Sequence, residues 1–290
     1  CQLRKLSPRT LKGRKNNNLA FLRYLKSEHQ VEKLNEVNYL MIQLYIQFLM
    51  DKKLSPVYIN SIIKELRAFF KYCTDEDYIK VNPMNKIKFQ KEPLALIETF
   101  NDQEVLRLVR HFNGKRFLDV RNRLIMIMLF DTGIRNNELC YLKVTDIRDT
   151  HINIIGKGNK QRYVPITPIL NKALIQYNRV RTPYIKDKVT YETEYLLLSQ
   201  KGRRLTVEAL ERIVKDAGIA VGVRQEIRCS PHTCRHYFAQ AQLRNGCDIY
   251  SLSKLLGHSN INTTKVYLKS MNNDEYINMT IKTSPLMNLL

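Results

Sequence analysis

Apolar residues recur at helical spacing over most of this 290-residue chain, and this periodicity restricts its fold more than any other feature. The pattern is clearest after Ser55-Pro56, a pair that is typical of a helix start. Spacings of three, four and seven residues place apolar side chains on one helix face, and they join Ile59, Ile62, Ile63, Leu66, Phe69 and Phe70. Ser7-Pro8 and the stretch from Val37 to Met50 repeat the signal. We therefore expect the first part of the chain to be helical throughout.

A polar segment interrupts this pattern and divides the chain. Pro83 breaks the helical spacing, and the stretch from Lys86 to Pro93 is mostly polar. A chain of this length suits two domains. We predict a helical domain over residues 1–88, a linker over residues 89–96 and a second domain over residues 97–290.

The second domain begins with further helix signals. Asn101 with Glu104 three residues later resembles a capping box. The run from Phe117 to Phe130 is apolar nearly all round, which predicts a buried helix. Gly133 then allows the chain to turn where that helix ends.

Only short segments of this domain favour strands. Residues 151–155 and 162–166 are β-prone runs on either side of a glycine-containing turn, and such a pattern is typical of a hairpin. A further strand is expected around Tyr195 to Leu198. The predicted fold class is mainly α with a small β-sheet.

The net charge is the first functional signal. It is +21, and both domains share it: residues 1–96 hold 18 Lys and Arg against 9 Asp and Glu, and residues 97–290 hold 30 against 18. Charge spread over a folded chain indicates a long polyanion that both domains contact. Charge alone does not separate DNA from RNA. The basic residues that we predict to contact DNA are Lys64, Arg67, Lys71, Lys88, Lys91, Lys160 and Arg162; for the first three, a solvated helix face is an equally weighted alternative.

Cysteine usage and hydropathy bear on the compartment. The six cysteines are scattered and form no C-x-x-C pair, so we expect neither a disulfide framework nor a zinc site. We interpret Cys229 and Cys234 as small buried apolar residues. The longest apolar run, Leu124 to Phe130, is far below the roughly 20 residues that a bilayer needs. These features favour a cytoplasmic protein.

Five local patterns of the second domain carry residues suited to chemistry. Each has an ordinary explanation when taken alone: an ion pair with Glu138 for Arg135, a solvated turn for Lys157, a buried structural side chain for His258. An H-x-x-R pair such as His232 and Arg235 is common by chance, and nothing local distinguishes Tyr267 from the other tyrosines. The order and spacing of the five patterns are more informative, and they are Thr132-Gly133-Ile134-Arg135-Asn136-Asn137-Glu138-Leu139, Gly156-Lys157-Gly158, Ser230 to His236, Leu255-Leu256-Gly257-His258-Ser259, and Tyr267 nine residues after His258.

In this order the patterns resemble the tyrosine recombinase (phage integrase) family over nearly the whole chain. The family has an Arg in T-G-x-R-x-x-E-L, a Lys on a β-hairpin, an H-x-x-R pair, a His after L-L-G, and a Tyr nine residues later. The first domain, above all Leu54 to Tyr72, is similar to the family's core-binding (SAM-like) domain. The resemblance implies an α/β catalytic domain that closes with the helical domain as a C-shaped clamp on DNA.

The resemblance also assigns roles in a DNA transesterification without metal or cofactor. Tyr267 is the expected nucleophile, which forms a 3′-phosphotyrosyl bond while the 5′-hydroxyl leaves. Arg135 and Arg235 would hold the phosphate, and Lys157 would protonate the leaving oxygen. His232 and His258 would donate hydrogen bonds to the phosphate or position Tyr267, and His232 is also a candidate acceptor of the phenol proton. Glu138 is expected to support Arg135 or its helix, and His236 to lie just behind the site.

Expected partners follow from the same resemblance. They are double-stranded DNA sites and further copies of the chain, a dimer on each site and a tetramer in the synapse, with the apolar C-terminal tail passed between protomers and the protein associated with the nucleoid. Integration or excision of a mobile element is the leading task, and Xer-type resolution of chromosome or plasmid dimers is the alternative. A type IB topoisomerase or telomere resolvase would share the chemistry but differ in the spacing around Tyr267. A non-catalytic helix-turn-helix regulator would explain the charge but not the ordered residues.

Overall fold

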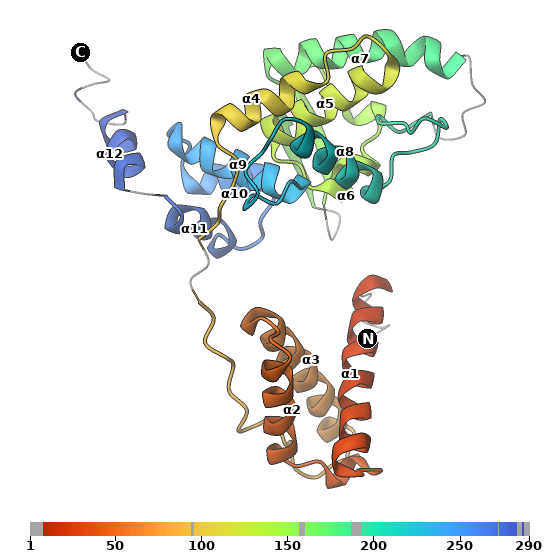
Figure 1. Ribbon diagram of the computed structural model, residues 1–290, viewed down its shortest axis with the longest axis vertical. Coiled ribbons are helices and arrows are strands. Elements are labelled where there is room, and N and C mark those ends of the chain that lie inside the picture. The colour runs from red at the N-terminus through yellow and green to blue at the C-terminus, as the bar shows by residue number, and fades with distance from the viewer. Residues whose placement is uncertain are drawn as a thin grey trace. The chain divides into compact units, whose positions relative to one another are not determined.

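The computed structural model describes residues 8–93, 96–156, 160–186, 193–271, 273–282 and 286 (Figure 1). Contacts divide the chain into one unit of residues 1–95 and another of residues 96–290. The division falls inside the segment that the sequence predicts to be a linker. Each unit has its own hydrophobic core.

The first unit consists of helices α1 (Pro8–His29), α2 (Tyr39–Asp51) and α3 (Pro56–Asp75), with a short 3-10 helix η1 (Leu34–Glu36) before α2. The Ser55 hydroxyl accepts a hydrogen bond from the Tyr58 backbone N–H and caps α3. The apolar face that the sequence predicts for α3 is buried, and Phe21 of α1 packs edge-on against Phe70 of α3. The expectation of an all-helical first domain is confirmed for the described residues.

The chain after α3 folds back along that helix. The buried Asn60 side chain acts like a strand partner for Gln90: its Nδ2 donates to the Gln90 carbonyl at 2.8 Å, and its Oδ1 accepts from the Gln90 N–H at 2.7 Å. Arg67 donates to the Ile87 carbonyl, and its guanidinium lies 4.1 Å from the Phe89 ring centroid. Two side chains of α3 therefore fix this returning segment.

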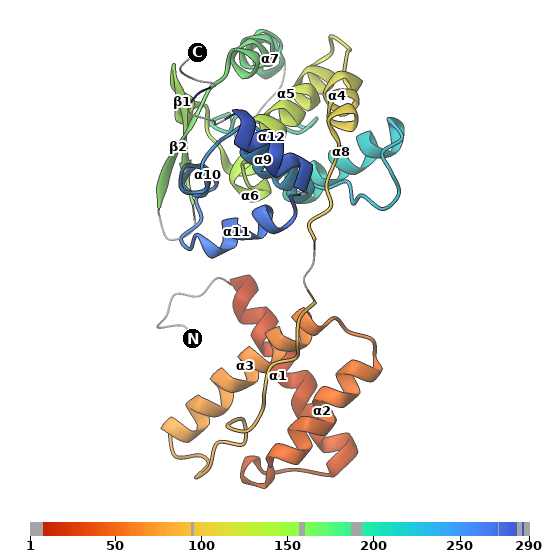
Figure 2. The ribbon, with the colours of Figure 1, turned by 90° about the vertical axis from the view of Figure 1, so that its left-hand side faces the viewer.

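The second unit surrounds one central helix, α5 (Phe117–Thr132), which is buried on most of its surface and packs against α7 (Pro168–Lys186) and α9 (Pro231–Arg244). Figure 2 shows the β1–β2 hairpin at the edge of these helices. The remaining elements are α4 (Asp102–His111), α6 (Asn136–Tyr141), η2 (Val144–Asp146), β1 (His151–Ile155), β2 (Gln161–Pro165), α8 (Val207–Ala220), α10 (Ile249–Leu256), α11 (Asn262–Lys269) and α12 (Asn273–Lys282).

The small sheet is smaller than expected. Strands β1 and β2 pair antiparallel with Ile152 opposite Val164, which confirms the hairpin with its second strand one residue earlier than predicted. The strand predicted around Tyr195 to Leu198 is wrong: there the described residues make only isolated bridges, from Lys143 to Tyr195 and from Leu198 to Arg204. Leu196 to Leu198 are all buried. Their backbone bonds go to separate segments of the chain, with the Leu196 N–H donating to the Leu142 carbonyl and the Leu197 carbonyl accepting from the Leu205 N–H, so no continuous edge strand forms.

The entry into the second unit is tied to the helices that follow the H-x-x-R pattern. The Ile97 N–H donates to the Ser270 hydroxyl just after α11, and the Gln240 side chain of α9 donates to the Ile97 carbonyl, both at 2.9 Å. The Thr99 hydroxyl donates to the Thr233 carbonyl at 3.0 Å. Hydrogen bonds from the first residues of the second unit thus hold this segment against α9 and the end of α11.

Two further expectations concern the cysteines and the hydropathy of the helices. Cys234 is fully buried, as expected, whereas Cys229 is half-buried beside Gly218. Among the helices described, none combines the length and the apolar character that a membrane crossing requires.

Candidate active site

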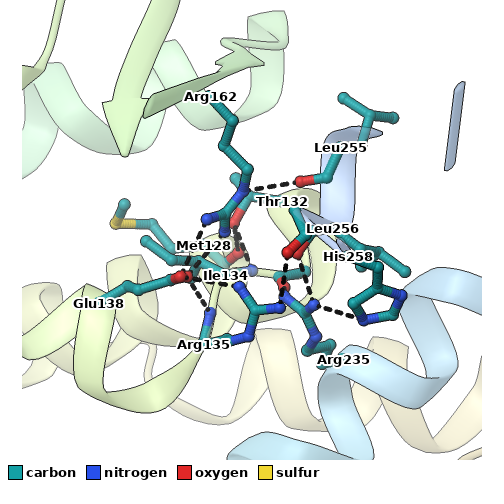
Figure 3. A network of polar contacts seen from close by, with 12 residues as sticks. Met128, Thr132, Ile134, Arg135, Glu138, Arg162, Arg235, Leu255, Leu256 and His258 are labelled. Atoms are coloured by element: carbon teal, nitrogen blue, oxygen red, sulfur yellow. Dashed lines mark hydrogen bonds and ion pairs between the residues drawn. The ribbon is translucent and has the colours of Figure 1, made fainter. Parts of the chain in front are cut away.

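Three arginines from three different elements converge on the C-terminal end of α10 (Figure 3). The last carbonyls of a helix lack partners within it and carry partial negative charge, so they suit guanidinium groups. Three consecutive carbonyls each accept from a different arginine: Leu255 from Arg162 Nε at 2.9 Å, Leu256 from Arg235 Nη2 at 2.7 Å, and Gly257 from Arg135 Nη2 at 3.0 Å. One helix end therefore orients all three cations.

The turn before Arg135 depends on glycine. Gly133 ends α5 in the left-handed conformation at φ 57°, which a side chain disfavours. A Cβ at this position would lie 2.3 Å from the Phe238 ring of α9. The close approach lets the Gly133 carbonyl accept from Arg235 Nη1 at 2.6 Å. The glycine of the T-G-x-R pattern thus brings the end of α5 against α9.

Glu138 joins two of the arginines. Its carboxylate accepts from the Arg135 N–H at 3.0 Å and from Arg135 Nη1 at 2.9 Å, which closes a capping box at the start of α6. It also accepts two bonds from Arg162, at 2.9 and 2.7 Å. Burial raises the pKa of Glu138, but the hydrogen bonds and charges of Arg162 and Arg135 outweigh burial, and the net pKa is lowered. The carboxylate is therefore ionised at neutral pH.

Arg162 requires a correction. We predicted that it contacts DNA, but its side chain is only 8% exposed and its guanidinium is bound by Glu138 and the Leu255 carbonyl. The reason is strand alternation, because Arg162 and Val164 share the inward face of β2. That alternation is visible in the sequence and could have warned against a DNA contact.

Buried Arg235 pairs with the half-buried His258. Arg235 is 3% exposed and lies 3.0 Å from His258 Nε2 through Nη2. Arginine can only donate, so Nε2 accepts and Nδ1–H donates to the Thr264 hydroxyl at 2.9 Å. Burial, followed by the charges of Arg235, Arg135 and Arg162, lowers the pKa of His258 to about 4. His258 is therefore neutral at pH 7 with a defined tautomer.

Tyr267 lies on α11 and is 3% exposed. Its hydroxyl is 3.1 Å from Nδ1 of His236. Burial raises the pKa of Tyr267, while the positive charges of Arg235 and Arg135 oppose this rise. Burial and the neighbouring charges of His232 and Arg235 lower the pKa of His236 to about 4, so a neutral imidazole faces the phenol.

The histidine that contacts Tyr267 is not the one that we expected. His232 was a candidate acceptor of the phenol proton, but among the described residues it is His236 whose ring nitrogen contacts the Tyr267 hydroxyl. His232 is exposed at the first turn of α9, and its ring centroid is 4.1 Å from that of His236. The two histidines are four residues apart on one helix and so share a face, a signal that was present in the sequence.

The other predicted residues are less closely placed. Lys157 lies outside the described residues, although both strands that flank it are described. Lys64, Lys71, Lys88, Lys91 and Lys160 are exposed, and Lys71 pairs with Asp75 on the helix surface. Arg67 is half-buried against the segment that returns along α3.

The site carries an excess of positive charge. Three guanidinium groups lie close to one carboxylate, that of Glu138, which pairs with only two of them, and His236 and His258 are neutral. Arg135 is the most accessible of the three arginines, since its side chain is 38% exposed. Within the part of the chain that is described, no group of three or more His, Cys, Asp or Glu side chains is placed to share a metal ion. The arrangement suits a phosphate group beside a tyrosine.

The lowered pKa values predict that acid destabilises the fold. In the unfolded chain histidines take up protons near their usual pKa of about 6.5, whereas folded His236 and His258 do so only near 4. The unfolded state therefore binds more protons in this window, and stability that is complete above pH 6.5 falls as the pH falls toward 4. Urea unfolding between pH 7 and pH 4.5 measures this loss. It should shrink in His236→Gln, which does not titrate; a midpoint that is flat in the wild type would contradict the neutral pair.

Comparison with known proteins agrees with this geometry. The phage integrase family matches residues 98–274, and the phage integrase SAM-like domain matches residues 2–90. A tyrosine recombinase XerC of Lacticaseibacillus casei (strain BL23) is 30% identical over 270 residues, which cover 91% of this chain and 89% of the relative.

Two solved structures share the fold. A lambda integrase dimer bound to a COC′ core site has a TM-score of 0.73 at 17% identity, over 92% of this chain and 91% of that one. The Tn1549 transposon integrase in complex with transposon right end DNA has a TM-score of 0.68 at 20% identity, over 98% of this chain and 97% of that one. The family match, the XerC relative and the ordered residues of the site together show that the chain belongs to the phage integrase family of tyrosine recombinases.

Proposed function

We propose that the protein is a site-specific DNA recombinase that cuts and rejoins DNA through a 3′-phosphotyrosyl bond at Tyr267. The observation that carries this proposal is the convergence of Arg135, Arg235 and His258 at one helix end, beside a tyrosine whose hydroxyl meets a neutral histidine. Such a site holds a phosphodiester and the nucleophile that attacks it.

The chemistry follows from the residue types. Ionising a phenol of pKa about 10 at pH 7 costs roughly 4 kcal/mol. Arg135 and Arg235 reduce this cost and stabilise the charge that builds on the nonbridging oxygens. The Tyr267 oxygen attacks phosphorus, and its proton passes to Nδ1 of His236. The bond to the 5′-oxygen breaks, and Lys157 is the proposed donor of a proton to that oxygen.

Rejoining is the reverse sequence with a new strand. The 5′-hydroxyl of the partner duplex attacks phosphorus and gives its proton to Lys157, which is neutral after the first step. The bond from phosphorus to the phenol oxygen breaks, and that oxygen regains its proton from His236. One phosphodiester replaces another, so the exchange needs no external energy source. Covalent catalysis of this kind divides a difficult exchange into two easier steps.

The proposed partners are two DNA sites and further copies of the chain. The charge of +21 supports DNA binding by both units, and the lambda integrase structure holds a dimer on DNA. We place a dimer on each site and a tetramer in the synapse. Contacts from Lys64, Lys71, Lys88, Lys91 and Lys160 belong to this proposal, as does a location in the cytoplasm on the nucleoid.

A covalent trap tests the proposal. DNA sites are first recovered by selecting bound fragments from a random-sequence pool, and one is rebuilt with a nick beside the cleavage position so that the cut end is lost. The intact protein should accumulate a protein–DNA adduct whose peptide map places the nucleotide on Tyr267. Absence of any adduct would refute the enzyme proposal and leave a DNA-binding regulator.

Two biological tasks remain for such an enzyme. Integration or excision of a mobile element is the leading proposal, in keeping with the shared fold of the transposon integrase. Xer-type resolution of DNA dimers is the second, and the XerC relative at 30% identity favours it. The DNA on both sides of the gene separates them: element ends that carry the selected sites support the first, and a single site elsewhere in the chromosome supports the second.

The C-terminal tail is part of the proposed assembly. In this structure α12 contacts α9 of its own unit through Arg244 and Glu275 at 3.4 Å, while most of residues 284–290 lie outside the described residues. We propose that these residues pass to a neighbouring protomer. Deleting residues 284–290 should strongly reduce synapsis of paired sites, measured by gel shift with two labelled duplexes, while binding to a single site persists. Unchanged synapsis would show that the tail packs on its own unit.

A further inference from the structure

We propose that Arg162 is a positioning residue that neutralises Glu138, so that the positive charge of Arg135 remains available to the scissile phosphate. This inference rests on the proposed function and gives a buried arginine outside the family pattern a role in that reaction. It also explains why a cation on the hairpin faces inward when the surface around it is already basic.

The geometry makes Arg162 the main counter-ion of Glu138. It forms a two-pronged ion pair with the carboxylate at 2.9 and 2.7 Å, with both side chains below a tenth exposed. Paired forks of this kind are the strongest ion pairs that arginine makes. Arg135 instead gives the carboxylate a single guanidinium bond at 2.9 Å and turns its other nitrogen to the Gly257 carbonyl. The partners are thus unequal.

Exposure separates the two arginines further. The Arg135 side chain is 38% exposed and is therefore accessible to a phosphate, whereas the Arg162 side chain is closed off at 8%. If Glu138 had Arg135 as its only partner, the carboxylate would cancel the charge that the phosphate needs. With Arg162 present, Glu138 holds Arg135 in place without consuming its charge.

The same side chain links three motifs. Arg162 lies on β2, the strand that follows the Gly156-Lys157-Gly158 pattern in the sequence. Its side chain pairs with Glu138 of the T-G-x-R-x-x-E-L pattern and donates to the Leu255 carbonyl of the L-L-G-H pattern. A Cβ on Gly257 would lie 2.9 Å from Arg162 Cδ, so the glycine before His258 makes room for this arginine. Its left-handed conformation, at φ 63°, independently favours glycine.

The test compares a charged and an uncharged scissile linkage. A methylphosphonate replaces one nonbridging oxygen by a methyl group and so removes the negative charge that Arg135 meets. We expect Arg162→Gln to lower the rate of adduct formation at saturating DNA about 100-fold on the phosphate, relative to the wild type. On the methylphosphonate the loss should be within about fivefold, because there is no charge left to compensate. Both rates come from one preparation, so a partly unfolded sample lowers them equally.

Further variants separate this role from simple support. Adding Glu138→Gln to Arg162→Gln should recover adduct formation on the phosphate at least about tenfold, since no buried carboxylate then competes for Arg135. Arg162→Lys keeps the charge but not the fork, and should show a smaller loss that is again larger on the phosphate. The control Arg212→Gln removes an 83% exposed arginine of α8 and should stay within about twofold on both substrates.

Two results would overturn the inference. Equal losses on both substrates, in Arg162→Gln or in Arg162→Lys, would mean that Arg162 only supports the fold. A weaker DNA affinity with an unchanged rate at saturation would mean that it contacts DNA, as the sequence first indicated. A wild-type protein that forms no adduct on the phosphate substrate would instead refute the proposed function itself.

Discussion

Replacing Tyr267 by Phe should abolish the covalent adduct on a nicked substrate, a loss of at least about 10⁴-fold relative to the wild type. The variant lacks one oxygen, which is the proposed nucleophile. The order of motifs in the family assigns this role to no other tyrosine of the chain. Gel analysis of the trapped product, with the intact protein as reference, measures the effect.

The fold and the DNA affinity should survive this change. The hydroxyl makes one hydrogen bond, to His236, and such a bond contributes only about 1 kcal/mol to stability. The buried ring remains in its place in the core of α9, α10 and α11. A variant that still formed the adduct would move the nucleophile to another residue, and loss of DNA binding in parallel would make the result uninformative about chemistry. Tyr276→Phe on α12 is a matched control, because its hydroxyl only donates to the Leu268 carbonyl.

Replacing Arg235 by Lys should give the second-largest effect, a loss of about 10²- to 10³-fold in the rate of adduct formation at saturating DNA. The guanidinium spans the Gly133 carbonyl, the Leu256 carbonyl and His258 at once. An ammonium group is a point charge without this fork, so it cannot hold the same three partners and a phosphate.

The electrostatic setting of Arg235 points the same way. Burial and the charge of Arg135 lower the pKa of Arg235 to about 10, which means that its positive charge is held at a cost that a bound phosphate relieves. The DNA dissociation constant of Arg235→Lys should therefore change much less than its rate. An unchanged saturated rate with weaker binding would make Arg235 a DNA contact only. Arg244→Lys, which ends α9 in surface ion pairs, is the control from the same helix.

Local sequence rules predict the elements of this fold well. The apolar spacing after Ser55-Pro56 predicts α3, and the apolar run from Phe117 with its terminal glycine predicts α5, because periodicity and capping act within a few residues. The strand expected near Leu196 failed for the opposite reason. Three successive leucines are buried there by neighbouring segments, and a local pattern cannot distinguish that burial from pairing in a sheet.

The site is predicted less completely than the elements. Spacing identifies Arg135, Arg235, His258 and Tyr267, and the structure brings them to one helix end. The sequence spacing gives no sign that three arginines bind three consecutive carbonyls, because these contacts join residues up to 122 positions apart. Long-range contacts of this kind also decide that His236, and not His232, faces the phenol.

The carbonyls that end α10 have a consequence for how members of this lineage can diverge. Each arginine contacts its own peptide unit, in the order Leu255, Leu256, Gly257, and His258 follows immediately. Inserting or deleting a single residue in this run would place a different carbonyl opposite each of the three arginines at the same time. Substituting single side chains could not restore all three contacts. A substitution of the partly exposed Leu255 leaves its peptide oxygen intact and should be tolerated far better. Along this turn, the number of residues therefore matters as much as the identity of Gly257 and His258.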